Sequence, residues 1–446
     1  MNRHLLRAAA LAAFAAVLLL AAAAPAARFD DDDDDDDRGR PATTARVATF
    51  NASLNRNGLG ELKADLLAST DMSRPGVVQA HNVAEIVQRI RPDVLLVNEF
   101  DFEPEALHLF ADRFLAVPHS DAAAISYPHR FIAPSNTGVP SGFDLDNNGT
   151  VGGGNDAFGF GNYPGQFGMA VYSRYPIDTG KIRTFQLFRW KDMPGARLPD
   201  NPATPAPADW YSPDELNVFR LSSKSHWDLP IRVGRKTVHF LVSHPTPPVF
   251  DDPPFFPAGV DFNGRRNADE IRFSADYITP GRTSRYIYDD SGRRGGLKSG
   301  SLFVVAGDQN SDPIDGDSIP GAIQQLLNHP LVNTSLTPSS PGAPQAAALQ
   351  GGANASHRGD PRFDTADFAD GAPGNLRADY VLPRKNMRML DARVFWPVRE
   401  DPLYRLAGDF VFENRFIGNG FPASDHRAVW IDVTIPSGDD DDDDDD

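Results

Sequence analysis

Short apolar runs recur along this chain, and most of them end in a polar residue. The clearest is Asp93–Asn98, in which Val-Leu-Leu-Val leads directly to Asn98 and Glu99. Unbroken apolar runs of this length suit β-strands that are covered on both faces. We therefore expect sheets packed inside a layered α/β fold, with strands at 46–51, 93–98, 168–173, 238–243, 302–306, 378–382 and 428–433.

Helical patterns lie between some of these strands. Apolar residues recur at helical spacing from Val77 to Ile90, and Arg91-Pro92 stops that helix. Further helices are predicted at 104–114, 268–278 and 320–328. Three long connections, 121–166, 198–214 and 337–370, are rich in Gly, Pro, Asn or Ser, which is typical of functional rims or insertions.

The two ends of the chain are not expected to belong to the fold. Residues 1–27 combine Arg3 and Arg7 with the apolar run Ala8–Ala24 and small residues at Ala24-Pro25-Ala26, which predicts a signal peptide removed on export. An uncleaved membrane anchor is the alternative, and no later stretch predicts a membrane span. We expect a secreted or periplasmic protein. The absence of cysteine excludes disulfides and thiolate chemistry.

The net charge of −18 comes mainly from two runs of eight Asp, at 30–37 and 439–446. Such runs repel themselves and are typical of solvated tails, although loose calcium binding is an alternative. The linker is placed at 28–45, a single domain at 46–436 and the tail at 437–446. That domain is only mildly acidic, without the positive bias that favours nonspecific duplex binding.

Polar side chains gather where the predicted strands end. Strand ends converge on one edge of an open α/β sheet, so side chains at those ends are expected to share a site. One such residue would be unremarkable, because Asp, Asn and His often end strands or make turns. The set comprises Asn51, Glu99, His244, Asp308, Asn310, Asp379, Asp425 and His426.

The order of these segments over residues 46–436 resembles the endonuclease/exonuclease/phosphatase superfamily. Gly307-Asp-Gln-Asn310 resembles its G-D-x-N, and Ser424-Asp-His426 matches its S-D-H. The strand from Gly168 to Ile177 resembles its G-x-A-x-x-S-R-x-P-I segment. The resemblance implies a four-layer α/β sandwich, with two mixed, mostly antiparallel sheets flanked by helices, and a single domain.

The same resemblance implies the roles of the site residues. Glu99 would be the principal metal ligand, with the amide oxygen of Asn51 and the carboxylate of Asp425 assisting. Asp308 would orient or deprotonate water, and Asn310 would donate to a phosphoryl oxygen. His426 would contact the phosphate, paired with Asp379, and His244, with a pKa near neutrality, would be a general acid or phosphate ligand. Oxygen ligands favour a hard cation, Mg²⁺ first and Mn²⁺ or Ca²⁺ as alternatives.

Two departures from the family pattern affect the expected site. Ser53 stands where some members carry a second carboxylate, which puts a second metal ion in doubt. Gly165 and Gln166 stand where a carboxylate supporting the second histidine is expected.

Other residues are weaker candidates. Lys224 and His226 could bind phosphate, with a solvent-facing Lys and a hydrogen-bonded structural His as equal alternatives. Asp312, Asp315 and Asp317 could coordinate a further cation, although Asp-rich turns are commoner. At least one of Arg265, Arg266 and Arg272 could reach the substrate, although solvated helix arginines are commoner.

A separate motif resembles a calcium-binding loop. Asp144, Asp146, Asn148 and Thr150 occupy positions one, three, five and seven of an EF-hand-like loop, and Gly149 makes the turn at six. Position twelve is Asn155, where a Glu is expected, and no helices clearly flank the loop. A structural Ca²⁺ site and a simple Asx/Gly-rich turn are both open.

The sequence therefore predicts a secreted divalent-metal-dependent hydrolase of phosphate esters. The substrate, a nucleic acid or a small molecule, stays open, and no protein partner is predicted. The alternative is a catalytically inert, calcium-dependent extracellular binding protein.

Overall fold

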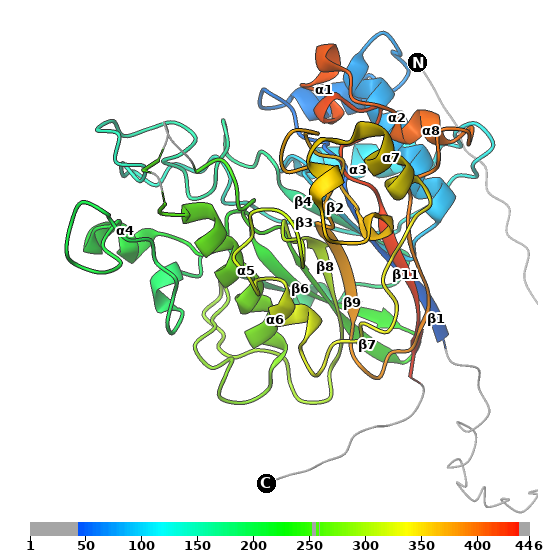
Figure 1. The fold of residues 1–446 in the computed structure, drawn as a ribbon. Helices are drawn as coiled ribbons and strands as arrows, with labels where there is room; N and C mark the ends of the chain where they lie inside the picture. Colours follow the sequence, from blue (N-terminus) through cyan, green and yellow to red (C-terminus); the bar gives the residue numbers. More distant parts are fainter. Residues whose placement is uncertain (1–42, 252–255, 258, 437–446) are drawn as a thin grey trace, which may run out of the picture. The chain divides into compact units, whose positions relative to one another are not determined.

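Two β-sheets occupy the centre of the molecule, as the computed structural model shows for residues 43–251, 256–257 and 259–436 (Figure 1). The predicted signal peptide and both Asp runs lie outside the described residues. The described residues fall within one compact unit. It begins with strand β1 at Thr43, so residues 43–45 belong to the fold and not to the predicted linker.

The first sheet has six strands and the second has five. In spatial order the first is β10 (Met389–Val394), β11 (Val429–Ile435), β1 (Thr43–Asn51), β2 (Val94–Asn98), β4 (Met169–Ser173) and β3 (His129–Ile132). The second is β5 (Arg183–Thr184), β6 (His226–Val233), β7 (Lys236–Ser243), β8 (Leu302–Asp308) and β9 (Asp379–Pro383). Only β1–β2 and β7–β8 pair in parallel, which confirms two mixed, mostly antiparallel sheets.

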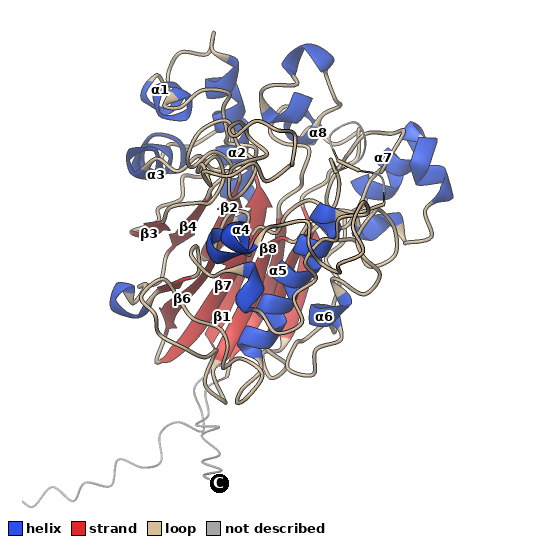
Figure 2. Cartoon of the chain, turned by 90° about the vertical axis from the view of Figure 1, so that its left-hand side faces the viewer, coloured by secondary structure: helices blue, strands red, loops and turns tan. Residues whose placement is uncertain are grey.

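Helices cover the outer face of each sheet (Figure 2). Beside the first sheet lie α1 (Glu61–Leu67), α2 (Pro75–Ile90), α3 (Pro104–Phe110) and a π-helical turn at Ala111–Leu115. Beside the second lie α5 (Phe262–Ile278) and α6 (Gln324–Leu327). Shorter helices in the connections are α4 (Pro213–Val218), α7 (Gly342–Gln350) and α8 (Tyr404–Ala407).

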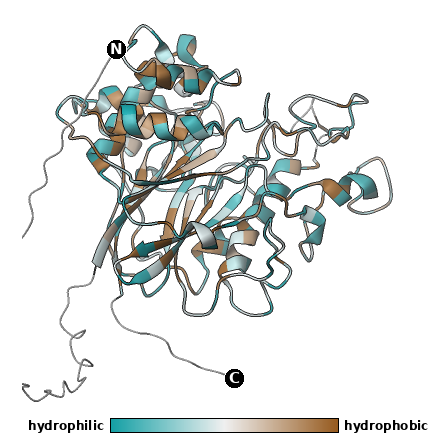
Figure 3. Ribbon diagram, turned by 180° about the vertical axis from the view of Figure 1, so that it is seen from behind, coloured by the Kyte–Doolittle hydropathy of each residue, from teal (hydrophilic) through white to brown (hydrophobic). Residues whose placement is uncertain are grey.

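Three hydrophobic layers hold this sandwich together, and β2 shows why. Successive side chains of a strand point to opposite faces. Leu95 and Val97 pack with the helices, whereas Val94 and Leu96 pack between the two sheets. Figure 3 shows the resulting pattern, with hydrophobic residues along the strands and helices of mixed character. The apolar run that predicted a strand covered on both faces is therefore explained, and the four-layer fold is confirmed.

Several element boundaries differ from the predictions. The helix predicted at 320–328 is reduced to α6, whereas the helix predicted at 268–278 begins at Phe262. The connections 121–166 and 337–370 contain β3 and α7. No helix in the described chain combines the length and apolar character needed to cross a membrane.

Candidate active site

The predicted site residues meet at one edge of the sandwich. Asn51 is paired with Asn98 at the carboxyl ends of parallel strands β1 and β2, and Glu99 follows directly. In the second sheet Asp308 ends β8 opposite Asp379, the first residue of β9. The side chain of Asn98 joins the two sheets here, because its Oδ1 accepts from the Asp308 amide (3.4 Å) and its Nδ2 donates to the Ser243 carbonyl (3.4 Å).

Asn51 connects the two principal carboxylates. Its Nδ2 donates to Oε1 of Glu99 at 3.1 Å and to Oδ2 of Asp308 at 3.0 Å. Its amide oxygen accepts from the Ser53 backbone N–H at 3.3 Å. Here the amide nitrogen faces the two carboxylates, so an oxygen contact from Asn51 to a cation, which stays a prediction, would require the amide to turn over.

His426 forms a buried pair with Asp379. Its Nδ1 lies 2.8 Å from Oδ2 of Asp379, which also accepts from the Thr365 hydroxyl at 2.8 Å. Burial lowers the pKa of His426, but the charges of Asp379 and Asp308 outweigh burial and hold that pKa well above its ordinary value. The Nε2 edge of the charged imidazolium faces Asp308, with Nε2 3.6 Å from Oδ2. The predicted pairing of His426 with Asp379 is confirmed.

Asp308 lies between the two histidines. Its Oδ2 is 3.3 Å from Nε2 of His244, and its Oδ1 accepts from the Asn310 backbone N–H at 2.9 Å. Burial alone would raise its pKa. The neighbouring imidazoles of His426 and His244, together with the amide of Asn51, lower that pKa instead, so Asp308 stays ionised.

His244 is neutral in this setting. Burial first, and then the charge of Lys224, lower its pKa to about 4, and its Nδ1 has no hydrogen-bond partner among the described residues. A near-neutral pKa would suit a general acid, and burial moves His244 below that range, so its role as general acid or phosphate ligand stays a prediction. Gln166 cannot support the ring, because its side chain accepts from the Asn162 amide and donates to the Arg56 carbonyl.

Glu99 is held in an unusual backbone conformation. Its φ of 57° lies in the left-handed region, which a residue with a side chain adopts only when its surroundings enforce it. Burial and the negative charge of Asp425 raise the pKa of Glu99 to about 7. Asp425 therefore lies close enough for its charge to act on Glu99, and its role as a further metal-side carboxylate stays a prediction.

A network of small polar groups surrounds Asp425. Its Oδ1 accepts from Asn419 Nδ2 (2.9 Å) and from the Ser53 hydroxyl (3.3 Å). Ser53, which replaces a carboxylate of the family pattern, thus positions Asp425 by hydrogen bonding. The Ser424 hydroxyl donates to the Asn51 carbonyl at 2.8 Å and ties this loop to the end of β1.

Asn310 is at the site, in the left-handed conformation (φ 49°). Its Nδ2 donates to the Pro245 carbonyl at 3.1 Å. An amide nitrogen has two N–H groups, so the predicted donation to a phosphoryl oxygen stays a prediction.

The structure separates the two tentative phosphate-binding residues. Lys224 is 6% exposed, and its ammonium group has no hydrogen bond or ion pair within the described chain. The charges of Glu270, Glu99 and Asp308 act on it, although burial is the larger effect and lowers its pKa. His226 instead uses both ring nitrogens in the fold, with Nδ1 2.9 Å from the Ser222 hydroxyl and Nε2 3.1 Å from the Glu270 carbonyl. The proposal of phosphate binding by His226 is wrong.

Among the residues that the structure describes, all of the remaining charged candidates except Asp317 have structural partners. Arg266 is buried and donates to the carbonyls of Leu221 and Arg220, and Arg272 pairs with Asp269. Asp312 accepts from backbone N–H groups of its own loop and of Arg377, and Asp315 accepts from those of Arg358 and Gly359. The expectation that these arginines or aspartates add a substrate or cation contact gains no support.

Sequence reasoning missed the residues that position the site. Thr365 bonds Asp379 through its hydroxyl, and Gln79 of α2 donates to the carbonyls of Ala52 and Ala423. Gln79 gave no sequence signal of its own, because Glu85 and Gln88 are further polar residues on the buried face of the same helix. Thr365 lies in an irregular connection, where no helical or strand periodicity marks it as a site residue.

The predicted calcium loop gains a third carboxylate. Side-chain oxygens of Asp144, Asp146 and Asp156 lie within 4.8 Å of one another. Asp156 follows the expected position twelve, where Asn155 instead donates to Oδ2 of Asp146 at 3.2 Å. Asn148 and Thr150 take part in the turn, since the Thr150 N–H donates to Oδ1 of Asn148 at 2.8 Å.

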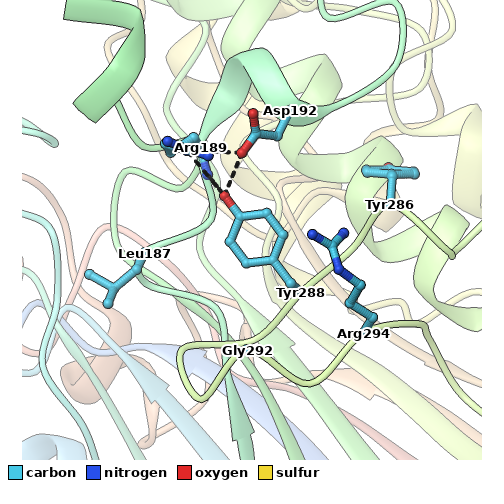
Figure 4. Close-up of a pocket in the computed structure, with 7 residues that line it drawn as sticks. All are labelled: Leu187, Arg189, Asp192, Tyr286, Tyr288, Gly292 and Arg294. Carbon is cyan, nitrogen blue, oxygen red and sulfur yellow. Dashed lines mark hydrogen bonds and ion pairs between the residues drawn. The ribbon is translucent and has the colours of Figure 1, made fainter.

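A surface cleft of about 620 Å³ lies elsewhere on the molecule, lined by Leu187, Arg189, Asp192, Tyr286, Tyr288, Gly292 and Arg294 (Figure 4). Its polar groups satisfy one another, because Tyr288 donates to Asp192 at 2.6 Å and Arg189 donates to Asp192 at 2.9 Å. None of the predicted site residues lines it.

The donor set at the site suits a hard divalent cation. Oxygens of Asp308 and Asp379 and a ring nitrogen of His426 lie within 4.8 Å of one another. Asp379 is bonded to His426 and Thr365, which leaves Asp308 as the carboxylate of this group that is open to a cation. Glu99 shares the Asn51 amide with Asp308, and the charge of Asp425 acts on Glu99. Burial, and then the charge of Asp425, raise the pKa of Glu99, and a cation bound beside it would favour its ionised form.

Comparison with known proteins gives one family. The sequence model described as "Endonuclease/Exonuclease/phosphatase family" matches residues 48–426. Similar solved structures include an endonuclease/exonuclease/phosphatase from Beutenbergia cavernae, with 16% identity over 88% of this chain and 72% of that one and a TM-score of 0.45. A family protein from Bacteroides thetaiotaomicron has 12% identity, coverages of 89% and 99% and a TM-score of 0.43. Sphingomyelinase C from Streptomyces griseocarneus has 16% identity over 87% of this chain and 99% of that one, with a TM-score of 0.42. No curated protein sequence matches the chain.

Proposed function

This chain belongs to the endonuclease/exonuclease/phosphatase family, and on that premise we propose that it hydrolyses phosphate esters with the help of a divalent cation. One observation carries the proposal. Asn51, Glu99, Asp308, Asp379 and His426, from both sheets, form a single hydrogen-bonded and charged cluster. Such an assembly leaves buried charges that have no structural use, which indicates a functional site.

The side chains suggest a division of labour. Asp308 stays ionised and accepts hydrogen bonds, so it can orient an attacking water and accept its proton. His426, charged and fixed by Asp379, can neutralise a phosphoryl or leaving oxygen. Lys224 adds a positive charge that no carboxylate of the described chain pairs directly.

Glu99 and Asp425, with Asp308, would hold Mg²⁺, or Mn²⁺ or Ca²⁺ in its place. The cation would supply charge neutralisation at the phosphoryl group and increase the acidity of bound water. Ser53 offers a hydroxyl where a second carboxylate would stand, so the proposal requires one cation.

A panel of substrates tests the proposal. Purified mature protein would be assayed on plasmid DNA, RNA, bis(p-nitrophenyl) phosphate, p-nitrophenyl phosphate, phytate and sphingomyelin, with EDTA and with each cation restored. We expect cation-dependent hydrolysis that Asp308→Asn reduces by at least about 10²-fold, the usual size of a general-base contribution. The matched control is Asp178→Asn, a surface residue paired with Lys181.

Folded protein that hydrolyses none of these esters would favour the inert calcium-dependent binding protein, for which the Asp144 loop is the supporting feature. Export is also part of the proposal. It rests on the N-terminal pattern of Arg3, Arg7 and the apolar run to Ala24, and N-terminal sequencing of protein recovered outside the cytoplasm tests it.

A further inference from the structure

The segment between α8 and β11 exposes an unusual group of aromatic side chains (Figure 1, orange-red). Phe410, Phe412 and Phe416 are 54%, 61% and 56% exposed, and neither α8 nor β11 covers them. Phenylalanine so exposed at several nearby positions is uncommon on the surface of a monomer and marks a contact surface.

The guanidinium of Arg415 lies over two of these rings. Its guanidinium carbon is 4.1 Å from the centre of the Phe412 ring and 4.3 Å from that of Phe416. Within the described chain its only hydrogen bond is to the Phe412 carbonyl, and it has no ion pair. Phe412, Arg415 and Phe416 therefore present two aromatic rings and one cation without an ion pair to solvent. We call these three side chains the 412–416 platform.

The platform is fixed close to the proposed catalytic site. Phe416 is three residues from Asn419, whose side-chain amide donates to Asp425 and to Ser53 at 3.1 Å, so about 11 Å of extended chain is the most that separates them. The Val411 N–H donates to the Gly420 carbonyl at 2.8 Å and closes the loop. Gly420 has φ of 94°, and an added Cβ would lie 2.4 Å from the Phe410 ring. One side of the Phe410 ring therefore packs against Gly420 of the loop while the rest of the ring stays exposed.

The composition of the platform argues against insertion into a bilayer. Arg415 lies between the exposed rings, and Glu413 and Asn414 are exposed beside them. Burying an unpaired guanidinium and a carboxylate in hydrocarbon costs several kcal/mol, which two Phe side chains would scarcely offset.

The charge of the chain argues against a site that holds a duplex through its phosphates. Outside the two Asp runs, which hold 16 of the 61 acidic residues, 45 acidic residues face 43 basic ones, and phosphate-based binding of a duplex requires clustered cations, of which the platform has only Arg415. Stacking on an aromatic ring contributes about 1–3 kcal/mol per base whatever the base, and Arg415 supplies a cation for an adjoining phosphate.

We propose that the 412–416 platform stacks the bases of a single-stranded nucleic acid whose scissile phosphate lies beside Asp308 and His426. This inference rests on the proposed function and narrows its substrate class. Phe412 and Phe416 supply the ring faces, and Arg415 binds the phosphate between the stacked bases.

The test measures binding without turnover. A 5′-fluorescein thymidine dodecamer with phosphorothioate linkages is titrated against the full protein in Mg²⁺, and its anisotropy is followed. Phe412→Ala, Phe416→Ala and Arg415→Ala should each weaken binding about tenfold, the usual loss for one stacked base. Arg415→Lys keeps the charge without the planar stack and should also weaken binding several-fold. Leu390→Ala, 44% exposed at the far end of β10, is the control and should change nothing.

Two further measurements separate the possible failures. Hydrolysis of bis(p-nitrophenyl) phosphate, which has no base, should be equal in all these variants. If the wild type does not hydrolyse bis(p-nitrophenyl) phosphate, the proposed function is rejected, but the binding measurement still tests the platform. Unchanged dodecamer affinity in the three alanine variants overturns the platform. The platform proposal is also overturned if the three alanine variants lose only their co-sedimentation with phosphatidylcholine or phosphatidylserine vesicles. That result would identify a lipid-binding surface.

Discussion

The two histidines of the site show how neighbouring residues set opposite charge states. His426 has Asp379 on one ring nitrogen and Asp308 near the other, so its imidazolium is stabilised. His244 shares Asp308, but burial first and then the charge of Lys224 lower its pKa, so the ring stays neutral. One oxygen of Asp308 thus faces a charged imidazolium and a neutral imidazole.

Replacing Asp379 by Asn tests the charge of His426. The amide keeps the shape but not the negative charge, so the pKa of His426 should fall. We expect kcat for bis(p-nitrophenyl) phosphate to decrease about 10²–10⁴-fold, with little change in KM. The alkaline limb of the pH profile should move to lower pH, because the imidazolium then loses its proton earlier. A profile unchanged in shape would contradict this assignment, and Thr365→Ser, which keeps the hydroxyl on Asp379, serves as control.

Glu99 should lower the stability of the metal-free protein. Its pKa is about 7 in the fold and about 4.5 unfolded, so the protonated form is favoured by folding. The contribution to stability is complete below pH 4.5 and is lost as the pH rises through 7. At pH 8 in EDTA, Glu99→Gln should raise the free energy of unfolding by up to about 3 kcal/mol.

Urea unfolding at two pH values measures this effect. The difference between wild type and Glu99→Gln should vanish near pH 4. Added Mg²⁺ should stabilise the wild type at pH 8 and have much less effect on the variant, because a ligand has been removed. Equal Mg²⁺ stabilisation of both proteins would show that Glu99 does not bind the cation.

Among the elements, the loop at 144–156 is the one whose stability we expect to depend most on a bound cation. Asp144, Asp146 and Asp156 bring three carboxylates together, although backbone and side-chain N–H groups already donate to them. If the loop binds Ca²⁺, cation binding to the native state alone should raise Tm.

We expect Ca²⁺, added with Mg²⁺ already in excess, to raise the Tm of the wild type by a few degrees. Asp156→Asn should abolish that rise and weaken calorimetric Ca²⁺ binding, whereas Asp214→Asn, at the exposed start of α4, should retain both. A wild-type Tm that does not respond to Ca²⁺ would identify the segment as an ordinary turn.

Across the whole molecule, stability should decrease in acid. His226 and His244 are buried and neutral, and burial lowers the pKa of each to about 4 from an unfolded value near 6.5. A depressed pKa contributes stability that is complete above 6.5 and is lost as the pH falls towards 4. Each histidine should cost about 3 kcal/mol over that range.

The free energy of unfolding in urea, measured at pH 7, 5 and 4, checks this expectation. His226→Gln should be less stable than the wild type at pH 7 but should lose less stability on acidification. A parallel decrease in both proteins would mean that His226 does not contribute to the acid response.

The elements that were predictable are those with a local signal. β2, β4 and β8 are apolar on both faces, and α2 carries a helical period that ends at Arg91-Pro92. β6 was not predicted, because Asp228 and Pro230 interrupt its pattern. In the fold Asp228 accepts from Tyr277, and β5 pairs with β6 only at Trp227 and Asp228, so the sheet tolerates the proline.

By itself the sequence determined the layered fold, the family and the residues that meet around Asp308, because strand periodicity and strand-end motifs are local properties. Only the tertiary structure decided which histidine carries charge, which way the Asn51 amide points, that His226 is structural, and that Asp156 joins the calcium loop. Burial and the fields of neighbouring charges determine those outcomes. The neighbours come from segments hundreds of residues apart, such as Asn51 and Ser424, and no local pattern encodes their approach.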